Sequence, residues 1–176
     1  MGIPIPGWQQ PPFVAITTQV FIGLTALPDV LYEIQYATVP DSPSPWHNRV
    51  VWAGMAAVTF MAWLWSARRR SAGHGRHRRA LAWAFGAWLV PGINLVWPYQ
   101  LVADVWQAAG FGRPTIVRWW WATFLFSFVL GPAVLWNLPV RWPVLLCAVA
   151  EAVAAVLAVV IVRRITAELS RWLPNT

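Results

Sequence analysis

Three acidic residues lie inside apolar stretches that are long enough to form membrane helices. Asp29 and Glu33 are four residues apart in the stretch 13–36, so a helix places them on one face. Glu151 is the single acidic residue of the stretch 143–163. Ionisable side chains inside a membrane are costly and are functional candidates by default. We therefore take Glu151, Asp29 and Glu33 as candidate catalytic residues.

A desolvated carboxylic acid can donate a proton to an apolar substrate, and aromatic faces can stabilise the carbocation that results. Burial of Glu151 favours its neutral form, which is the form that donates. The side chains expected to line such a site, or to lie at the depth of the acids, are Trp88, Asn94, Trp97, Arg49 and Arg141. A structural ion-pair cluster, or a protonated Glu151 bonded to a neighbouring helix, is the alternative interpretation.

The composition indicates the elements that must position these residues. The chain of 176 residues is 59% hydrophobic and 11% charged, whereas about a quarter of the residues of a soluble domain are charged. This predicts an all-α integral membrane bundle that forms one polytopic domain. A membrane span needs about 20 helical residues, and four runs are long enough, at 13–36, 49–67, 117–136 and 143–163.

The stretch 80–109 is apolar but is interrupted by Pro91, Gly92 and Pro98. Its first part is too short to span, so we expect a re-entrant segment that dips into the membrane and returns. Gly92 is expected to adopt a backbone conformation that other residues disfavour, with Asn94 capping freed backbone groups. From Pro98 to the glycine at 110, the alternation of polar and apolar residues predicts an interfacial amphipathic helix.

The arginines test this topology independently, because cytoplasmic loops carry the excess of basic residues. All thirteen basic residues are arginine, and six of them lie in the loop 68–79. If the segment 80–109 returns to the side it entered from, eleven arginines are cytoplasmic and only Arg49 and Arg141 face outward. If the segment crosses the membrane, seven arginines are cytoplasmic and six face outward. The first arrangement predicts a multi-pass protein of the cell membrane with both termini cytoplasmic.

Several classes of site are disfavoured. The arginines of the loop 68–79 are not interleaved with aromatic stacking platforms, so we expect no nucleic-acid partner. His74 and His77 have a metal-like spacing but lie among six arginines, whose charge opposes cation binding. Cys147 is the single cysteine and forms no redox pair. We therefore expect no metal and no cofactor.

The block Trp88-x-Val90-Pro91-x-x-Asn94-x-x-x-Pro98, with Asp104, Trp106 and Arg118-Trp119-Trp120 after it, carries a family resemblance. It resembles the actinobacterial family of small membrane proteins that is catalogued only as a domain of unknown function. The similarity covers roughly residues 50–165. It implies a multi-span membrane fold and no particular chemistry. Asp29, Glu33 and Glu151 lie outside its core pattern.

Two classes of function follow from the sequence. The first is a non-enzymatic accessory, assembly or permeation module in the bilayer, whose alanine ladder at 150, 154 and 158 permits close helix contact. The second is a membrane enzyme on an apolar substrate, such as a protonation-initiated isoprenoid (terpene) cyclase, an isomerase or lyase, with Glu151 as the acid. The expected partners are the lipid bilayer, an apolar isoprenoid-like ligand or a membrane protein, and a second copy of the chain.

Overall fold

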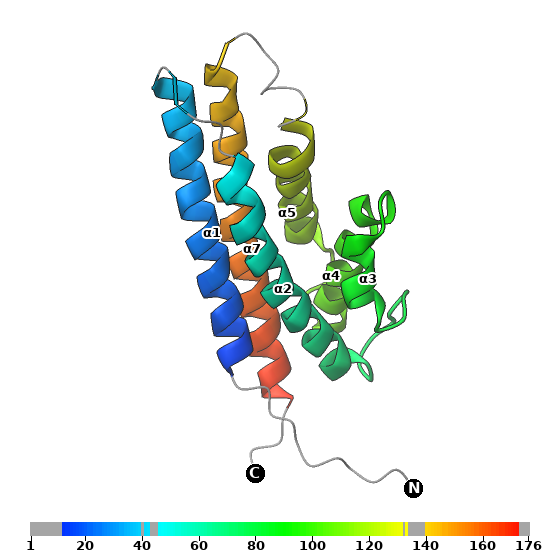
Figure 1. Ribbon diagram of the computed structural model, residues 1–176. Coiled ribbons are helices and arrows are strands. Elements are labelled where there is room, and N and C mark those ends of the chain that lie inside the picture. The colour runs from blue at the N-terminus through cyan, green and yellow to red at the C-terminus, as the bar shows by residue number, and fades with distance from the viewer. Residues whose placement is uncertain (1–11, 40, 43–45, 132, 134–139, 173–176) are drawn as a thin grey trace, which may run out of the picture.

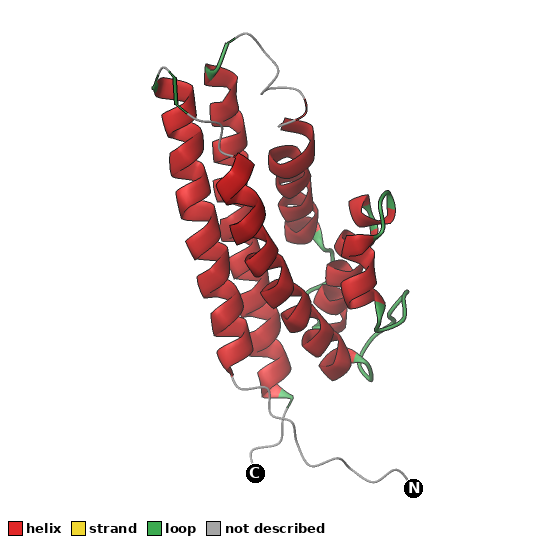
Figure 2. Ribbon diagram, in the orientation of Figure 1, coloured by secondary structure: helices red, strands yellow, loops and turns green. Residues whose placement is uncertain are grey.

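The computed structural model describes residues 12–39, 41–42, 46–131, 133 and 140–172, without the side chains of Pro12 and of residues 46–52. All secondary structure in these ranges is helical, as the composition predicts (Figure 2). The long elements are α1 (Pro12–Thr38), α2 (Trp46–Ser71), α5 (Thr115–Leu125), which continues into the π-helical turn η2 (Phe126–Leu130), and α7 (Leu145–Arg171). The short elements are α3 (Trp83–Leu89), η1 (Ile93–Leu95), α4 (Trp97–Ala108) and η3 (Trp142–Val144).

The long helices form a bundle in which neighbours run in alternating directions (Figure 1). α2 and α7 end at the end of the bundle where α1 begins, and α5 runs in the same direction as α1 but begins nearer the middle, beside α4. We call this the basic end, because α2 terminates there in Arg68, Arg69 and Arg70. The chain between α2 and α5 leaves the basic end, forms α3 and α4 at the side of the bundle, and enters α5, which runs away from the basic end (Figure 1).

Two helices in the described part of the chain are long and apolar enough to cross a membrane, Phe13–Thr38 and Trp142–Arg171. The apolar helix Thr115–Leu130 is shorter. Length and composition thus make a membrane bundle plausible, with α1 and α7 as its candidate spans. The end of the predicted run 117–136 lies largely outside the described residues.

The break in the segment 80–109 has the predicted position. α3 ends at Leu89, and Gly92 has a φ angle of 80°. The backbone N–H of Asn94 donates to the carbonyl of Val90 at 3.0 Å, so the backbone of Asn94 closes this turn. Pro98 lies in the first turn of α4, and Gly110, with φ at 85°, follows its end. Glycine tolerates these positive φ angles, which side chains with a Cβ disfavour.

The surroundings of α4 differ from the expectation of an interfacial amphipathic helix. Leu101, Val102 and Val105 are fully buried, and Asp104, expected on the polar face, is only 2% exposed. The reason is that α2, α3, α5 and α7 all pack around α4. An arginine from the preceding loop also neutralises Asp104, so that side chain needs no contact with water.

Several tryptophans lie in sequence near the inner ends of the predicted spans, where tryptophans usually form an interfacial belt. In the structure Trp63, Trp106, Trp120 and Trp121 are instead core residues, at most 7% exposed. The indole N–H of Trp63 donates to the Thr166 hydroxyl at 3.0 Å and joins α2 to α7. These rings fill the space between helices that diverge toward the basic end. Trp119, which is 62% exposed, does face outward.

Candidate functional site

A cleft of about 420 Å³ lies between α1, α2, α5 and α7. An apolar cavity of about 150 Å³ is large enough for a benzene ring, so the cleft has nearly three times the space that such a ring needs. The residues that line it are Ile22, Thr25, Ala26, Ala53, Gly54, Ala56, Ala57, Phe60, Trp88, Trp120, Phe124, Phe128, Glu151, Ala154, Ala155 and Ala158.

The cleft exists because small residues face large ones across it. α2 and α7 contribute alanine and glycine, of which Ala154 and Ala158 are one helical turn apart and share a face. Two members of the alanine ladder of α7, Ala154 and Ala158, thus line a cleft within this chain. α5 contributes a run of rings in which Phe124 stacks on Phe128 with centroids 4.8 Å apart. Small side chains cannot reach these rings, and the space between them stays open.

Glu151 is the single ionisable residue in the described lining of the cleft. It is 3% exposed and lies one turn before Ala154, on the buried face of α7. The same lining includes the aromatic rings of Trp120 and Phe124 on α5. A carboxyl group at this position can hydrogen-bond to a polar end of an apolar molecule, or exchange a proton with it.

Asp29 and Glu33 are also buried, at 2% and 0% exposure. They continue the buried face of α1 beyond Ile22 and Thr25, which line the cleft. α1 and α7 are antiparallel and have 27 residues each. Glu33 lies five residues before the end of α1, and Glu151 lies six residues after the start of α7. At a rise of ~1.5 Å per residue, these positions are about 7.5 and 9 Å from the respective helix ends. Asp29, nine residues in, is about 13.5 Å deep.

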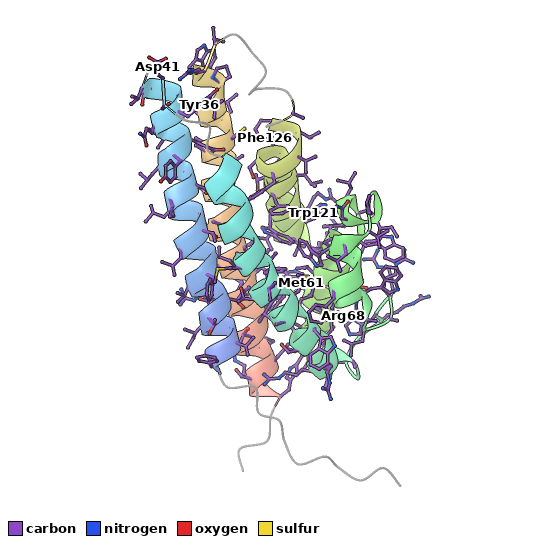
Figure 3. The ribbon with its side chains drawn as sticks, viewed as in Figure 1. Tyr36, Asp41, Met61, Arg68, Trp121 and Phe126 are labelled. Carbon is purple, nitrogen blue, oxygen red and sulfur yellow. The ribbon has the colours of Figure 1, made fainter. Side chains whose placement is uncertain are left out.

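The three candidate acids therefore lie at similar depth near the end of the bundle opposite the basic end. We call this depth the acidic level. Figure 3 shows the two ends, with Tyr36 and Asp41 at the acidic one and Arg68 at the basic one. At this end of the bundle, Arg141, which precedes η3 and α7, contacts the end of α1: its guanidinium donates to the carbonyl of Val39 at 3.4 Å. Similar depth is required of groups that share one site.

The other predicted lining residues have different positions. Trp88 does line the cleft, edge-on to Phe60 at 5.8 Å between ring centroids. Trp97 lies away from it, against Trp83 and beneath the guanidinium of Arg79. Asn94, in η1, is not a lining residue among those described.

The two outward arginines do not line the described cleft either. Arg141 lies over the ring of Tyr36 at 4.9 Å and borders a shallow pocket with Asp41. The side chain of Arg49 is outside the described residues. Within those residues, no three of the His, Cys, Asp and Glu side chains are grouped so as to hold a metal ion.

A second polar cluster, at the basic end, was missed by the sequence reasoning. The Asp104 carboxylate accepts from the backbone N–H of Arg78 at 2.9 Å and from its Nε at 2.8 Å. Arg68, only 3% exposed, donates through Nη2 to the carbonyl of Arg79. Burial lowers the pKa of Arg68, and the nearby Asp104 carboxylate opposes that effect. The sequence signal that could have revealed this cluster is Asp104, an acidic residue in the helix that follows an arginine-rich loop.

This cluster shows why the arginine loop is folded rather than free. Asp104 holds Arg78 by two hydrogen bonds, and Gly75 packs on Ala108 so closely that an added Cβ would lie 2.6 Å from the alanine Cβ. Among the described residues, the Nε and Nη1 of Arg68 have no hydrogen-bond partner. The cluster is structural, because it anchors the loop to α4 beneath the cleft.

Comparison with known proteins gives a family and no function. A family model described as "Domain of unknown function (DUF4328)" matches residues 48–167. The match includes Glu151, the aromatic side of the cleft and the Asp104 cluster, whereas Asp29 and Glu33 on α1 lie outside it. No curated protein and no solved structure matches the chain.

Proposed function

The chain belongs to the DUF4328 family, and we propose that it is a polytopic membrane protein whose cleft holds an apolar ligand inside the bilayer without transforming it. In this role it is a non-enzymatic accessory module. The ligand is a linear or folded hydrocarbon of isoprenoid-like character, and its one polar group lies near Glu151.

Four spans are proposed to carry this cleft: α1, α2, α5 with its continuation, and α7. Both termini and the loop 68–79 are cytoplasmic in this arrangement. The arginine distribution of the sequence supports it, as does the direction of α5, which runs away from the basic end as α1 does (Figure 1).

The observation that carries the proposal is the chemistry of the cleft. Its described walls are hydrocarbon and aromatic except for Thr25 and Glu151. Ligand sites of about 300–1,000 Å³ with mostly apolar walls and few polar groups are typical of proteins that hold small molecules. By the benzene comparison, the volume takes roughly fifteen carbon atoms.

Native mass spectrometry of the full chain, released from membranes in mild detergent, tests this function. We expect a co-purified apolar molecule in stoichiometric amount. Ala155→Leu should displace it, because this alanine lines the cleft. Ala152→Leu is the matched control, since that alanine is exposed on the same helix. Equal retention by both variants, or no retained molecule in the unmodified protein, would contradict the proposal.

A second candidate function is favoured because Glu151 and several aromatic rings line the same cleft. A protonated carboxyl could add its proton to a carbon–carbon double bond of a linear isoprenoid, which leaves a carbocation. The rings of Trp88, Trp120 and Phe124 could stabilise that cation, and proton loss to the carboxylate would complete an isomerisation. Incubation with linear polyprenes distinguishes this enzyme from the module: cyclised products of unchanged mass require the enzyme.

A further inference from the structure

The outward face of α7 has an apolar stripe that ends in an arginine. Val149 and Val156 are 63% and 62% exposed, and Leu146 and Val153 extend the same stripe. Residues seven apart share a helix face, so Arg163, seven residues after Val156, continues it toward the basic end. Arg163 is itself exposed.

Four exposed arginines, on α7, on α5 and in the turn before α5, lie at a similar level along the axis of the bundle. An added Cβ on Gly131 would lie 2.3 Å from the Sγ of Cys147, which fixes the register of α5 against α7. Counted from Gly131, Arg118 is 13 residues toward the basic end, and Arg113 lies in the turn just before α5. Counted from Cys147, Arg163 and Arg164 are 16 and 17 residues in the same direction. We call Arg113, Arg118, Arg163 and Arg164 the arginine group.

The acids near the basic end do not neutralise this group. Asp104 is bonded to Arg78, and Glu168 is paired with Arg171 at 2.8 Å. Within the described part of the chain, none of the four arginines of the group takes part in an ion pair. Trp119, next to Arg118, is 62% exposed, which is typical of an indole at a membrane interface.

We propose that this surface binds an anionic phospholipid. The acyl chain lies along the stripe of Leu146, Val149, Val153 and Val156, and the phosphate is held by the arginine group. Guanidinium groups bind phosphate through paired N–H donors, and basic residues beside a membrane attract anionic lipids. The continuity of the arginines with an apolar stripe favours a lipid over free phosphate or a nucleic acid. This surface lies outside the cleft, and the proposal is independent of what the cleft holds.

The test uses the full chain reconstituted in vesicles of equal parts phosphatidylcholine and phosphatidylglycerol, followed by native mass spectrometry of the released protein. We expect phosphatidylglycerol to dominate the retained phospholipid. Arg163→Gln and, separately, Arg118→Gln on the other helix should each lower that retention about fivefold. Arg76→Gln is the matched control, because it removes one exposed charge from the loop at the same end, and it should change retention less than twofold.

Three results would overturn the proposal. The first is an equal loss in Arg76→Gln and the two other variants, which indicates a diffuse surface charge. The second is equal retention of the two lipids. The third is displacement of phosphatidylglycerol by millimolar inorganic phosphate or by a single-stranded oligonucleotide. Circular dichroism of each variant checks that helix content is unchanged, and two variants on different helices make a shared folding defect recognisable.

Discussion

Gly131 and Cys147 are in such close contact that a Cβ atom on the glycine would lie 2.3 Å from the cysteine Sγ. The same Cβ would lie 2.8 Å from the carbonyl oxygen of Phe126. The glycine follows the π-helical turn Phe126–Leu130, where the chain leaves regular α-helix. This contact brings α5 against α7 and so sets one wall of the cleft.

Gly131→Ala should therefore destabilise the protein by about 2 kcal/mol, as insertion of a methyl group into a packed site does. Thermal melting in detergent micelles measures the effect. The substitution Cys147→Ala in the same chain should restore part of the loss, because it removes the nearer of the two obstructing atoms. An unchanged melting temperature in Gly131→Ala would show that the two helices can separate freely.

Gly92→Ala should destabilise the protein by more than about 1 kcal/mol, since alanine at a positive φ is strained. No atom stands within 4 Å of a Cβ at Gly92, so the effect isolates backbone conformation from crowding. Gly23→Ala is the control: its Cβ site is also open, but it lies within helix α1, where alanine is favoured. Equal melting temperatures for the two variants would remove the argument for a tight turn.

Asp104→Asn should cost about 3 kcal/mol, because it leaves the buried guanidinium of Arg68 without its counter-charge. Arg78 would also lose a charge-assisted hydrogen bond. The comparison is Glu168→Gln, which breaks the exposed pair with Arg171 and should cost less than about 1 kcal/mol. Limited proteolysis within residues 72–79 gives a second measurement, and faster cleavage is expected only in Asp104→Asn. Identical cleavage rates would mean that Asp104 does not anchor the loop.

Glu151→Gln should fold normally and silence any reaction or transport step that needs the proton of Glu151. Glutamine keeps the size and hydrogen-bonding capacity of a neutral glutamic acid but cannot release a proton. The measurements are turnover of linear polyprenes and retention of the ligand by native mass spectrometry, with retention expected to persist. Intact turnover in this variant would assign Glu151 a structural role.

Single-cysteine labelling in a Cys147→Ala background measures the proposed topology. A cysteine introduced at Ser170, which is exposed beside the end of α7, should react with a membrane-impermeant reagent only after the cells are opened. A cysteine at Asp41, just after α1, should react in intact cells. Labelling of position 170 from outside would exclude the re-entrant arrangement.

The sequence by itself determined the helical class, the approximate helix positions and the break at Gly92. These features depend on local properties: apolar runs, the fixed φ of proline, and the freedom of glycine at positive φ. The burial of Glu151 also followed from its isolation in an apolar run. The acidic level could be anticipated because a rise of ~1.5 Å per residue converts position in a helix into depth.

Only the tertiary structure decided which faces meet. The sequence predicted that the alanines of α7 form a surface for close helix contact, and the structure shows that Ala154, Ala155 and Ala158 line a cleft together with rings of α5. Asp104 read as a water-facing residue, since its helix shows a polar stripe, but Arg78 arrives from 26 residues earlier in the chain and allows it to be buried. Trp63 and Trp120 were expected at the interface because they lie near the ends of predicted spans, but both are buried. Packing partners distant in sequence determine burial, and no local pattern records them.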